Sequence, residues 1–183
     1  MNFSDNDVFL ERINEIELCL EHDFYFAALG LSLTLPDICG RAEYPSGNVT
    51  QRYIQWYNQY IGQYEKPHSL YDNDMPYLSG EVVYNLRNSF LHAGIPNIEK
   101  GKIKDELCQI DQFTLELGKS SLGDTSVVSY GTAWGVKERK YIIAVRPFCI
   151  KLCRVAKAYY FENKDKFDFF CCNLEYLDND SWS

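Results

Sequence analysis

The sequence predicts a mainly α-helical bundle, with a small β-hairpin or three-stranded sheet inserted before the last long helix. Apolar residues recur at helical spacing through the first half of the chain. A β-rich stretch then interrupts this pattern, and the helical period returns near the C-terminal end. No internal repeat or Gly/Ser linker divides the 183 residues, so we expect a single domain over residues 1–183.

Two helices are expected in the first part of the chain. Residues 7–21 place apolar side chains at helical spacing, which predicts an amphipathic first helix. Residues 24–35 are apolar nearly all round, so we expect them to form a central helix that is buried on every side. Proline lacks a backbone N–H and clashes with the preceding helical turn, so this helix should end or kink near Pro36.

The next stretch predicts a loop, a third helix and a second loop. Residues 37–48 contain two glycines and a proline, which favours a loop. Thr50 is a suitable N-cap for a helix over residues 51–61, whose aromatic and isoleucine side chains supply an apolar surface. Residues 62–78 are again typical of a loop.

A fourth helix with two distinct faces is expected between Ser79, a suitable N-cap, and Gly94, a suitable C′ glycine. At about 100° per residue, the apolar arc consists of Val82, Val83, Leu86, Phe90 and Ala93. The polar arc consists of Glu81, Asn85, Asn88 and His92. We expect Val82, Val83, Leu86 and Phe90 to pack against the helix of residues 24–35.

The second half of the chain predicts a small sheet followed by a long helix. Residues 113–117 alternate with period two, and residues 126–130 and 140–143 are rich in β-formers. Residues 118–125 are the expected turn between the first two strands. Residues 146–166 return to helical spacing and should form the last long helix.

Charge argues against one class of function and leaves a local exception. The net charge of −8 disfavours nonspecific binding of nucleic acid over the whole surface. Residues 137–157 nevertheless contain seven of the 18 basic residues and a single acid. Four of these basic residues form the candidate RNA-binding patch: Arg146, Lys151, Arg154 and Lys157. The alternative is a solvated helix face without a ligand.

Composition also restricts metal sites and location. The seven cysteines are an odd number and lack C-x2-C spacing, so we expect reduced thiols and no structural zinc. The three histidines form no His-x3-His pair, so we expect no catalytic metal and no cofactor. No apolar run reaches the ~20 residues of a membrane span, and the polar N-terminus differs from a signal peptide. We therefore predict a cytoplasmic protein that does not contact membranes.

The strongest candidate for a catalytic site is formed by Arg87, Asn88 and His92. Histidine can exchange a proton at neutral pH, and arginine offers a planar, permanently charged group to phosphoryl oxygens. Asn88, one turn before His92, can orient the imidazole or bind a phosphate oxygen. A structural alternative stays open, because a histidine in the last turn of a helix can simply complement the helix dipole. A buried His92 and a carboxylate paired with Arg87 would favour that alternative.

The Arg-Asn-x-x-x-His pattern at Arg87, Asn88 and His92 resembles the signature of the HEPN superfamily. The tract from about Leu29 to Gly94 is similar to an uncharacterised group of bacterial proteins with this motif. The resemblance implies a HEPN-like helical bundle and metal-independent cleavage of single-stranded RNA to 2′,3′-cyclic phosphate and 5′-hydroxyl ends. It also implies a homodimer that brings two motifs to a shared cleft. A role as a toxin or phage-defence effector, with an antitoxin or other partner protein, is a further expectation.

Two other classes of function fit the sequence. A non-catalytic HEPN-like module that binds a nucleotide or a partner protein agrees better with the acidic net charge. A purely structural or interaction protein is the third class, in which Arg87 and His92 only stabilise the end of their helix. A basic cleft around His92 would favour the ribonuclease over both.

Overall fold

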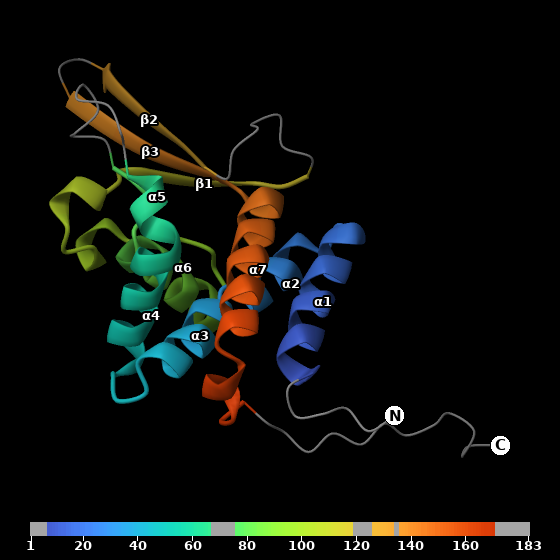
Figure 1. Ribbon diagram of the computed structural model, residues 1–183. Helices are drawn as coiled ribbons and strands as arrows, with labels where there is room; N and C mark the ends of the chain where they lie inside the picture. The colour runs from blue at the N-terminus through green and yellow to red at the C-terminus, as the bar shows by residue number, and fades with distance from the viewer. Residues whose placement is uncertain (1–6, 67–75, 119–125, 134–135, 171–183) are drawn as a thin grey trace.

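A computed structural model describes residues 7–66, 76–118, 126–133 and 136–170, with side chains left undescribed for residues 126–137. The protein is mainly helical, as the sequence predicts (Figure 1). The helices are α1 Asp7–Glu21, α2 Tyr25–Ser32, α3 Leu35–Glu43, α4 Val49–Tyr57, α5 Gln63–Glu65, α6 Gly80–Ala93 and α7 Val145–Glu162. A π-helical turn, Asn58–Gly62, joins α4 to α5, and 3₁₀ turns lie at Lys100–Lys102, Glu106–Cys108 and Lys164–Phe167.

A three-stranded sheet precedes the last long helix and confirms the predicted insertion. Its strands are β1 Gln112–Glu116, β2 Ser126–Ala133 and β3 Val136–Ala144, in the order β1-β3-β2. β1 runs parallel to β3, whereas β2 runs antiparallel to it. The sheet lies across one end of the helices, and β3 leads directly into α7 (Figure 1). The predicted turn at residues 118–125 falls almost entirely outside the described residues.

The core surrounds α7, which contacts α1, α2 and α3. Its apolar side chains Phe148, Leu152 and Ala156, which recur at helical spacing, are buried. α4 supplies large aromatic side chains to the same core, namely Tyr53, Trp56 and Tyr57. The amphipathic α1 is confirmed with the predicted bounds and buries its face of Phe9, Ile13, Ile16 and Leu20.

The helix predicted over residues 24–35 corresponds to α2, which ends earlier than expected, and a separate helix follows it. α2 ends at Ser32 and α3 begins at Leu35, because Pro36 sits in the first turn of α3, where a missing N–H leaves no broken hydrogen bond. The loop prediction for residues 37–48 was therefore wrong over most of its length. Gly40 is not a helix breaker there, since a Cβ at this position would lie 2.6 Å from the Arg52 carbonyl oxygen. It allows α3 and α4 to approach closely.

Burial on every side was also wrong for the start of α2. Phe24 and Phe26 expose 62% and 52% of their surface.

The third helix differs from its predicted form at both of its ends. Asn48, rather than Thr50, caps α4 by accepting a hydrogen bond from the Gln51 amide at 2.9 Å. Helical structure then continues through the π turn to α5, into the segment predicted as loop.

α6 begins and ends as the sequence predicts. The Ser79 side chain accepts a hydrogen bond from the Val82 amide, and Gly94 adopts a left-handed φ of 70°. Val82, Val83 and Leu86 are buried, but the predicted partner helix is only partly correct. α6 packs mainly against α4, and it reaches α2 through Phe90, whose ring lies 6.1 Å from that of Phe26.

Candidate functional site

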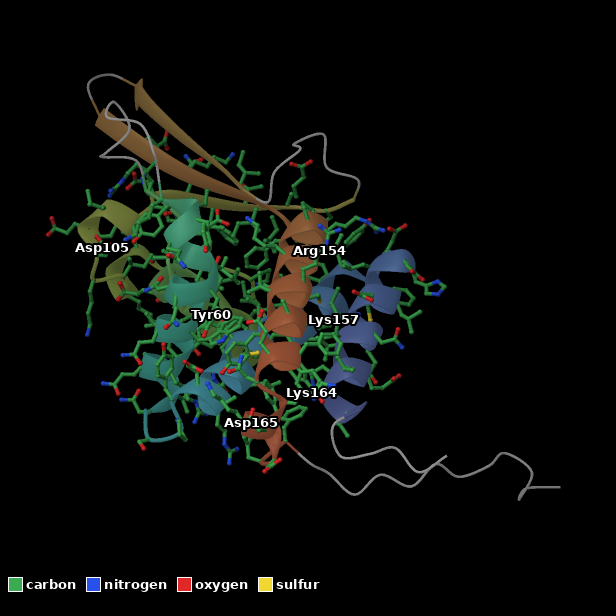
Figure 2. All side chains as sticks on the ribbon, in the orientation of Figure 1. Tyr60, Asp105, Arg154, Lys157, Lys164 and Asp165 are labelled. Atoms are coloured by element: carbon green, nitrogen blue, oxygen red, sulfur yellow. The ribbon has the colours of Figure 1, made fainter. Side chains whose placement is uncertain are left out.

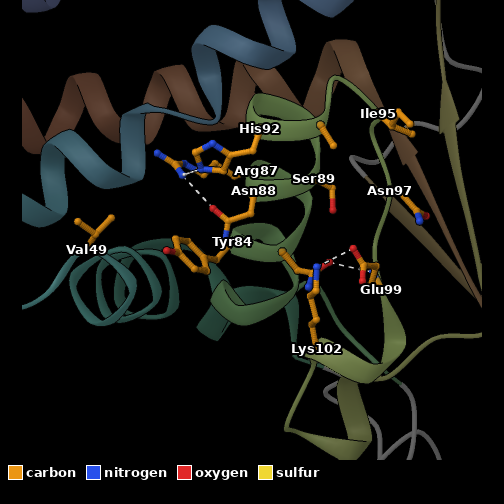
Figure 3. A pocket seen from close by; sticks show the side chains of 12 residues that line it. Val49, Tyr84, Arg87, Asn88, Ser89, His92, Ile95, Asn97, Glu99 and Lys102 are labelled. Carbon is orange, nitrogen blue, oxygen red and sulfur yellow. Dashed lines mark hydrogen bonds and ion pairs between the residues drawn. The ribbon is translucent and has the colours of Figure 1, made fainter.

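Arg87, Asn88 and His92 meet on the surface of α6 (Figure 3). The Nη1 atom of Arg87 lies 2.9 Å from Asn88 Oδ1 and 3.2 Å from His92 Nε2. Because a guanidinium can only donate, His92 Nε2 is the acceptor in this arrangement, and the neutral ring carries its proton on Nδ1. The structure therefore brings together the three residues that the sequence singles out.

These residues line a pocket of about 750 Å³. Residues of α6 form its floor, the segment of residues 95–102 forms one wall, and Val49 lies at its border (Figure 3). This volume lies within the range of small-molecule and cofactor sites in proteins. Tyr84, Ser89, Asn97 and Lys102 add polar groups around the motif. The pocket is therefore large enough and polar enough for a nucleotide.

Arg87 and His92 lack the contacts that a purely structural role would produce. His92 is exposed at the end of α6. Within the described ranges, no carboxylate pairs with Arg87, and its buried Nε has no hydrogen-bond partner. Arg87 Cζ also lies 6.0 Å from the centroid of the Tyr84 ring. The guanidinium charge is therefore available to an anion that enters the pocket.

The polar arc of α6 contains residues that hold the neighbouring segment and residues that are open to the pocket. Asn85, Asn88 and His92 all line the pocket, but Asn85 is buried and accepts a hydrogen bond from the Glu99 amide at 2.9 Å. Glu81 accepts from the amides of Lys104 and Asp105 at 3.0 and 3.2 Å. Sequence periodicity placed Glu81 and Asn85 on this arc but could not predict that they hold the pocket wall.

The candidate RNA-binding residues of α7 lie away from this pocket, since none of the four lines it. Arg146 donates a hydrogen bond to the Leu20 carbonyl at 2.5 Å, and Lys151 forms an ion pair with Glu65. Arg154 and Lys157 are exposed along α7 (Figure 2). The structure thus shows two exposed cations on α7 rather than one patch that continues to the motif.

Lys102 is a site residue that sequence reasoning missed. It lines the pocket from the 3₁₀ turn Lys100–Lys102 and forms an ion pair with Glu99 at 2.7 Å. The signal available in the sequence was the alternation of lysines at positions 100, 102 and 104, directly after the motif helix. That signal does not reveal which lysine reaches the pocket.

Three buried cysteines of the described residues, Cys39, Cys149 and Cys153, do not offer a reactive thiolate. Burial raises the pKa of Cys149 and Cys153 to about 12, which disfavours the nucleophilic thiolate. Cys39 is also buried, and its pKa is raised well above the ordinary value. In these same parts of the chain, no group of three or more His, Cys, Asp or Glu residues is arranged to hold a metal ion.

Comparisons with protein-family models, curated proteins and solved structures found no significant match. Among the described helices, none combines the length and the apolar character needed to cross a membrane.

Proposed function

We propose that this protein is a metal-independent endoribonuclease of the HEPN type. The observation that carries the proposal is the contact of Arg87 with both Asn88 and His92 inside a pocket, with no carboxylate of the described residues pairing the guanidinium. A carboxylate paired with Arg87, or a buried His92, would have supported the structural alternative instead. The resemblance of the motif to the HEPN signature agrees with this assignment.

The arrangement suits cleavage by the RNA's own 2′-hydroxyl. The Arg87 guanidinium would turn from His92 Nε2 toward the phosphate, and the freed Nε2 would accept the 2′-hydroxyl proton as the oxygen attacks the neighbouring phosphorus. Arg87 would stabilise the negative charge that builds on the phosphoryl oxygens. Asn88, which accepts a hydrogen bond from Arg87, would hold the guanidinium in place. The 5′-oxygen leaves with a proton, and the products are a 2′,3′-cyclic phosphate and a 5′-hydroxyl.

Protonation of the leaving oxygen calls for a second proton-transfer group. A homodimer would supply it by placing a second copy of the motif at the same cleft. Leu91 and Ile95, on either side of His92 in the sequence, expose 40% and 64% of their surface. These apolar side chains support a contact between two copies near His92. Tyr84 is less suited to that contact, because its hydroxyl accepts a hydrogen bond from Thr50.

A second candidate is a non-catalytic module that binds a nucleotide or a partner protein, such as an antitoxin. Two observations favour it: the net charge is −8, and the exposed cations of α7 do not extend to the pocket. Such a module would use the same pocket for recognition without transferring a proton.

RNA cleavage by the purified protein distinguishes the two candidates. We expect the wild type to cut single-stranded RNA of mixed sequence and to leave 2′,3′-cyclic phosphate ends. EDTA should not change the rate, because the RNA supplies the nucleophile. His92→Ala should lower the rate by about 10²-fold or more. Binding of RNA without cleavage would support the non-catalytic module instead.

A further inference from the structure

We propose that Lys102 forms a second phosphate subsite, so that the pocket binds a strand with at least two phosphates rather than a mononucleotide. The identity of the strand as RNA rests on the proposed function, but the subsite itself rests on the pocket. Asn85, Arg87, His92 and Lys102 all line it. The seven helical steps from Asn85 to His92 extend about 10 Å along the helix axis, which exceeds the size of a single phosphate.

Lys102 is fixed relative to the motif by contacts on both sides of its turn. Asn85 holds the Glu99 amide before the turn, and Glu81 holds the amides of Lys104 and Asp105 after it. Asn85 and Glu81 belong to α6, the same helix that carries Arg87 and His92. A phosphate bound at Lys102 would therefore keep a defined distance from the guanidinium and the imidazole.

The ammonium of Lys102 can exchange its present partner for a phosphate. Its partner Glu99 lies three residues earlier in the sequence. The side chains of Lys102 and Glu99 expose 63% and 47% of their surface. Exposed pairs of this kind contribute little to stability, so replacing the carboxylate by a phosphate costs little. Figure 3 shows this pair at the opposite end of the pocket from Arg87 and His92.

The neighbouring Lys100 provides a matched comparison. It lies in the same 3₁₀ turn, carries the same charge and pairs with Asp111 at 2.6 Å, but it does not line the pocket.

Glu99 provides a second test, in which strand binding is expected to become stronger rather than weaker. Its carboxylate occupies the Lys102 ammonium and repels a phosphate, whereas its backbone amide makes the contact with Asn85. Glu99→Gln removes the charge without removing the amide.

The experiment measures binding of a fully 2′-deoxy single strand of mixed sequence, which lacks the nucleophile, by fluorescence anisotropy over a series of salt concentrations. Lys102→Met should weaken binding several-fold and reduce the slope of log K against log salt by about 0.7, the value expected for one lost phosphate contact. Glu99→Gln should strengthen binding. Lys100→Met should leave the slope at the wild-type value.

Equal slopes for Lys102→Met and Lys100→Met would overturn the proposal, as would a wild type that binds no strand. Weaker binding by Glu99→Gln would also overturn it, because a merely structural ion pair would be lost in that variant. Cleavage of RNA is measured separately, so the two proposals can fail independently. A Lys102 effect on binding in a protein that cuts nothing would support the subsite and contradict the ribonuclease.

Discussion

Arg87 differs from Arg52, Arg139 and Arg146 in what its guanidinium contacts. Arg52 pairs with Asp37 at 2.9 Å, and Arg139 lies 4.0 Å from Asp111. Arg146 donates to the Leu20 carbonyl and lies 3.9 Å from Asp23. Arg87 instead contacts an amide oxygen and an imidazole. Its charge is thus left for a ligand, and its position in the pocket assigns it to the site.

Glu43 gives a prediction about pH at the residue scale. The Lys166 ammonium at 2.7 Å, together with the Tyr159 hydroxyl at 2.8 Å, lowers the pKa of the Glu43 carboxyl. A carboxyl whose pKa is lower in the folded state stabilises the protein above its unfolded-state pKa. This contribution is lost as the pH falls through the folded-state pKa. Glu43→Gln should therefore destabilise the protein at neutral pH and do so less in acid.

Urea midpoints near pH ~7 and near pH ~3 test this expectation. The midpoints of wild type and Glu43→Gln should differ at neutral pH and converge in acid. Glu106→Gln, a change at an exposed position, should follow the wild type at both pH values. A constant difference between Glu43→Gln and wild type across the range would show that the Glu43 charge is not responsible.

At the scale of elements, α6 packs closely against α4 because Gly80 has no side chain. A Cβ at Gly80 would lie 2.6 Å from the Ile54 carbonyl oxygen, which is backbone and cannot move aside easily. Gly80→Ala should therefore push the start of α6 away from α4 and lower the free energy of unfolding by about 1–3 kcal/mol. Chemical denaturation measures the change.

Gly101→Ala is the matched control, because a Cβ at that position meets nothing within 4 Å. It should leave the unfolding free energy within about 0.5 kcal/mol of the wild type. An equally stable Gly80→Ala protein would mean that α4 and α6 do not approach as closely as this contact requires.

Much of α6 could be predicted from sequence, because its signals are local. Ser79 and Gly94 act within one helical turn, and the apolar arc follows directly from the helical period. The partner of that arc is set by tertiary packing, so α4 could not be distinguished from α2. The direct contact of Arg87 with His92 was not predictable from their spacing, because positions five residues apart lie about 140° from each other around a helix. Burial of Asn85 was not predictable either, since it depends on where residues 99–105 return.

Glycine and proline misled the prediction of α3 for a related reason. Both residues are common in loops, and Gly40 was counted as a loop signal. Its real constraint is the close approach of the Arg52 carbonyl from α4, a contact between helices that local sequence does not contain. The sheet was easier to predict, because its alternating and β-branched strands differ from all surrounding helical sequence.

At the scale of the whole molecule, α7 forms the centre of the helices and the sheet covers one end (Figure 1). The pocket belongs to α6 and its covering segment, so a second copy could approach His92 without disturbing α7. We expect a homodimer in sedimentation experiments at micromolar concentration. Leu91→Asp should convert it to a monomer, because it places a charge in the expected contact.

Leu107→Asp is the control for this prediction. Leu107 exposes 48% of its surface, similar to the 40% of Leu91, but lies in the 3₁₀ turn Glu106–Cys108. This variant should remain a dimer. A monomeric wild type, or dissociation by both variants alike, would contradict a dimer formed around His92.

The most direct test of the central claim is the single-turnover rate of RNA cleavage in matched histidine variants. His92→Ala and Arg87→Ala should each lower the rate by about 10²-fold or more, and Asn88→Ala should lower it less, because Asn88 acts through Arg87. His22→Ala, which replaces an exposed histidine stacked on Phe24, should cleave at the wild-type rate. Equal rates for His92→Ala and His22→Ala would contradict the assignment of His92 as the proton-transfer residue.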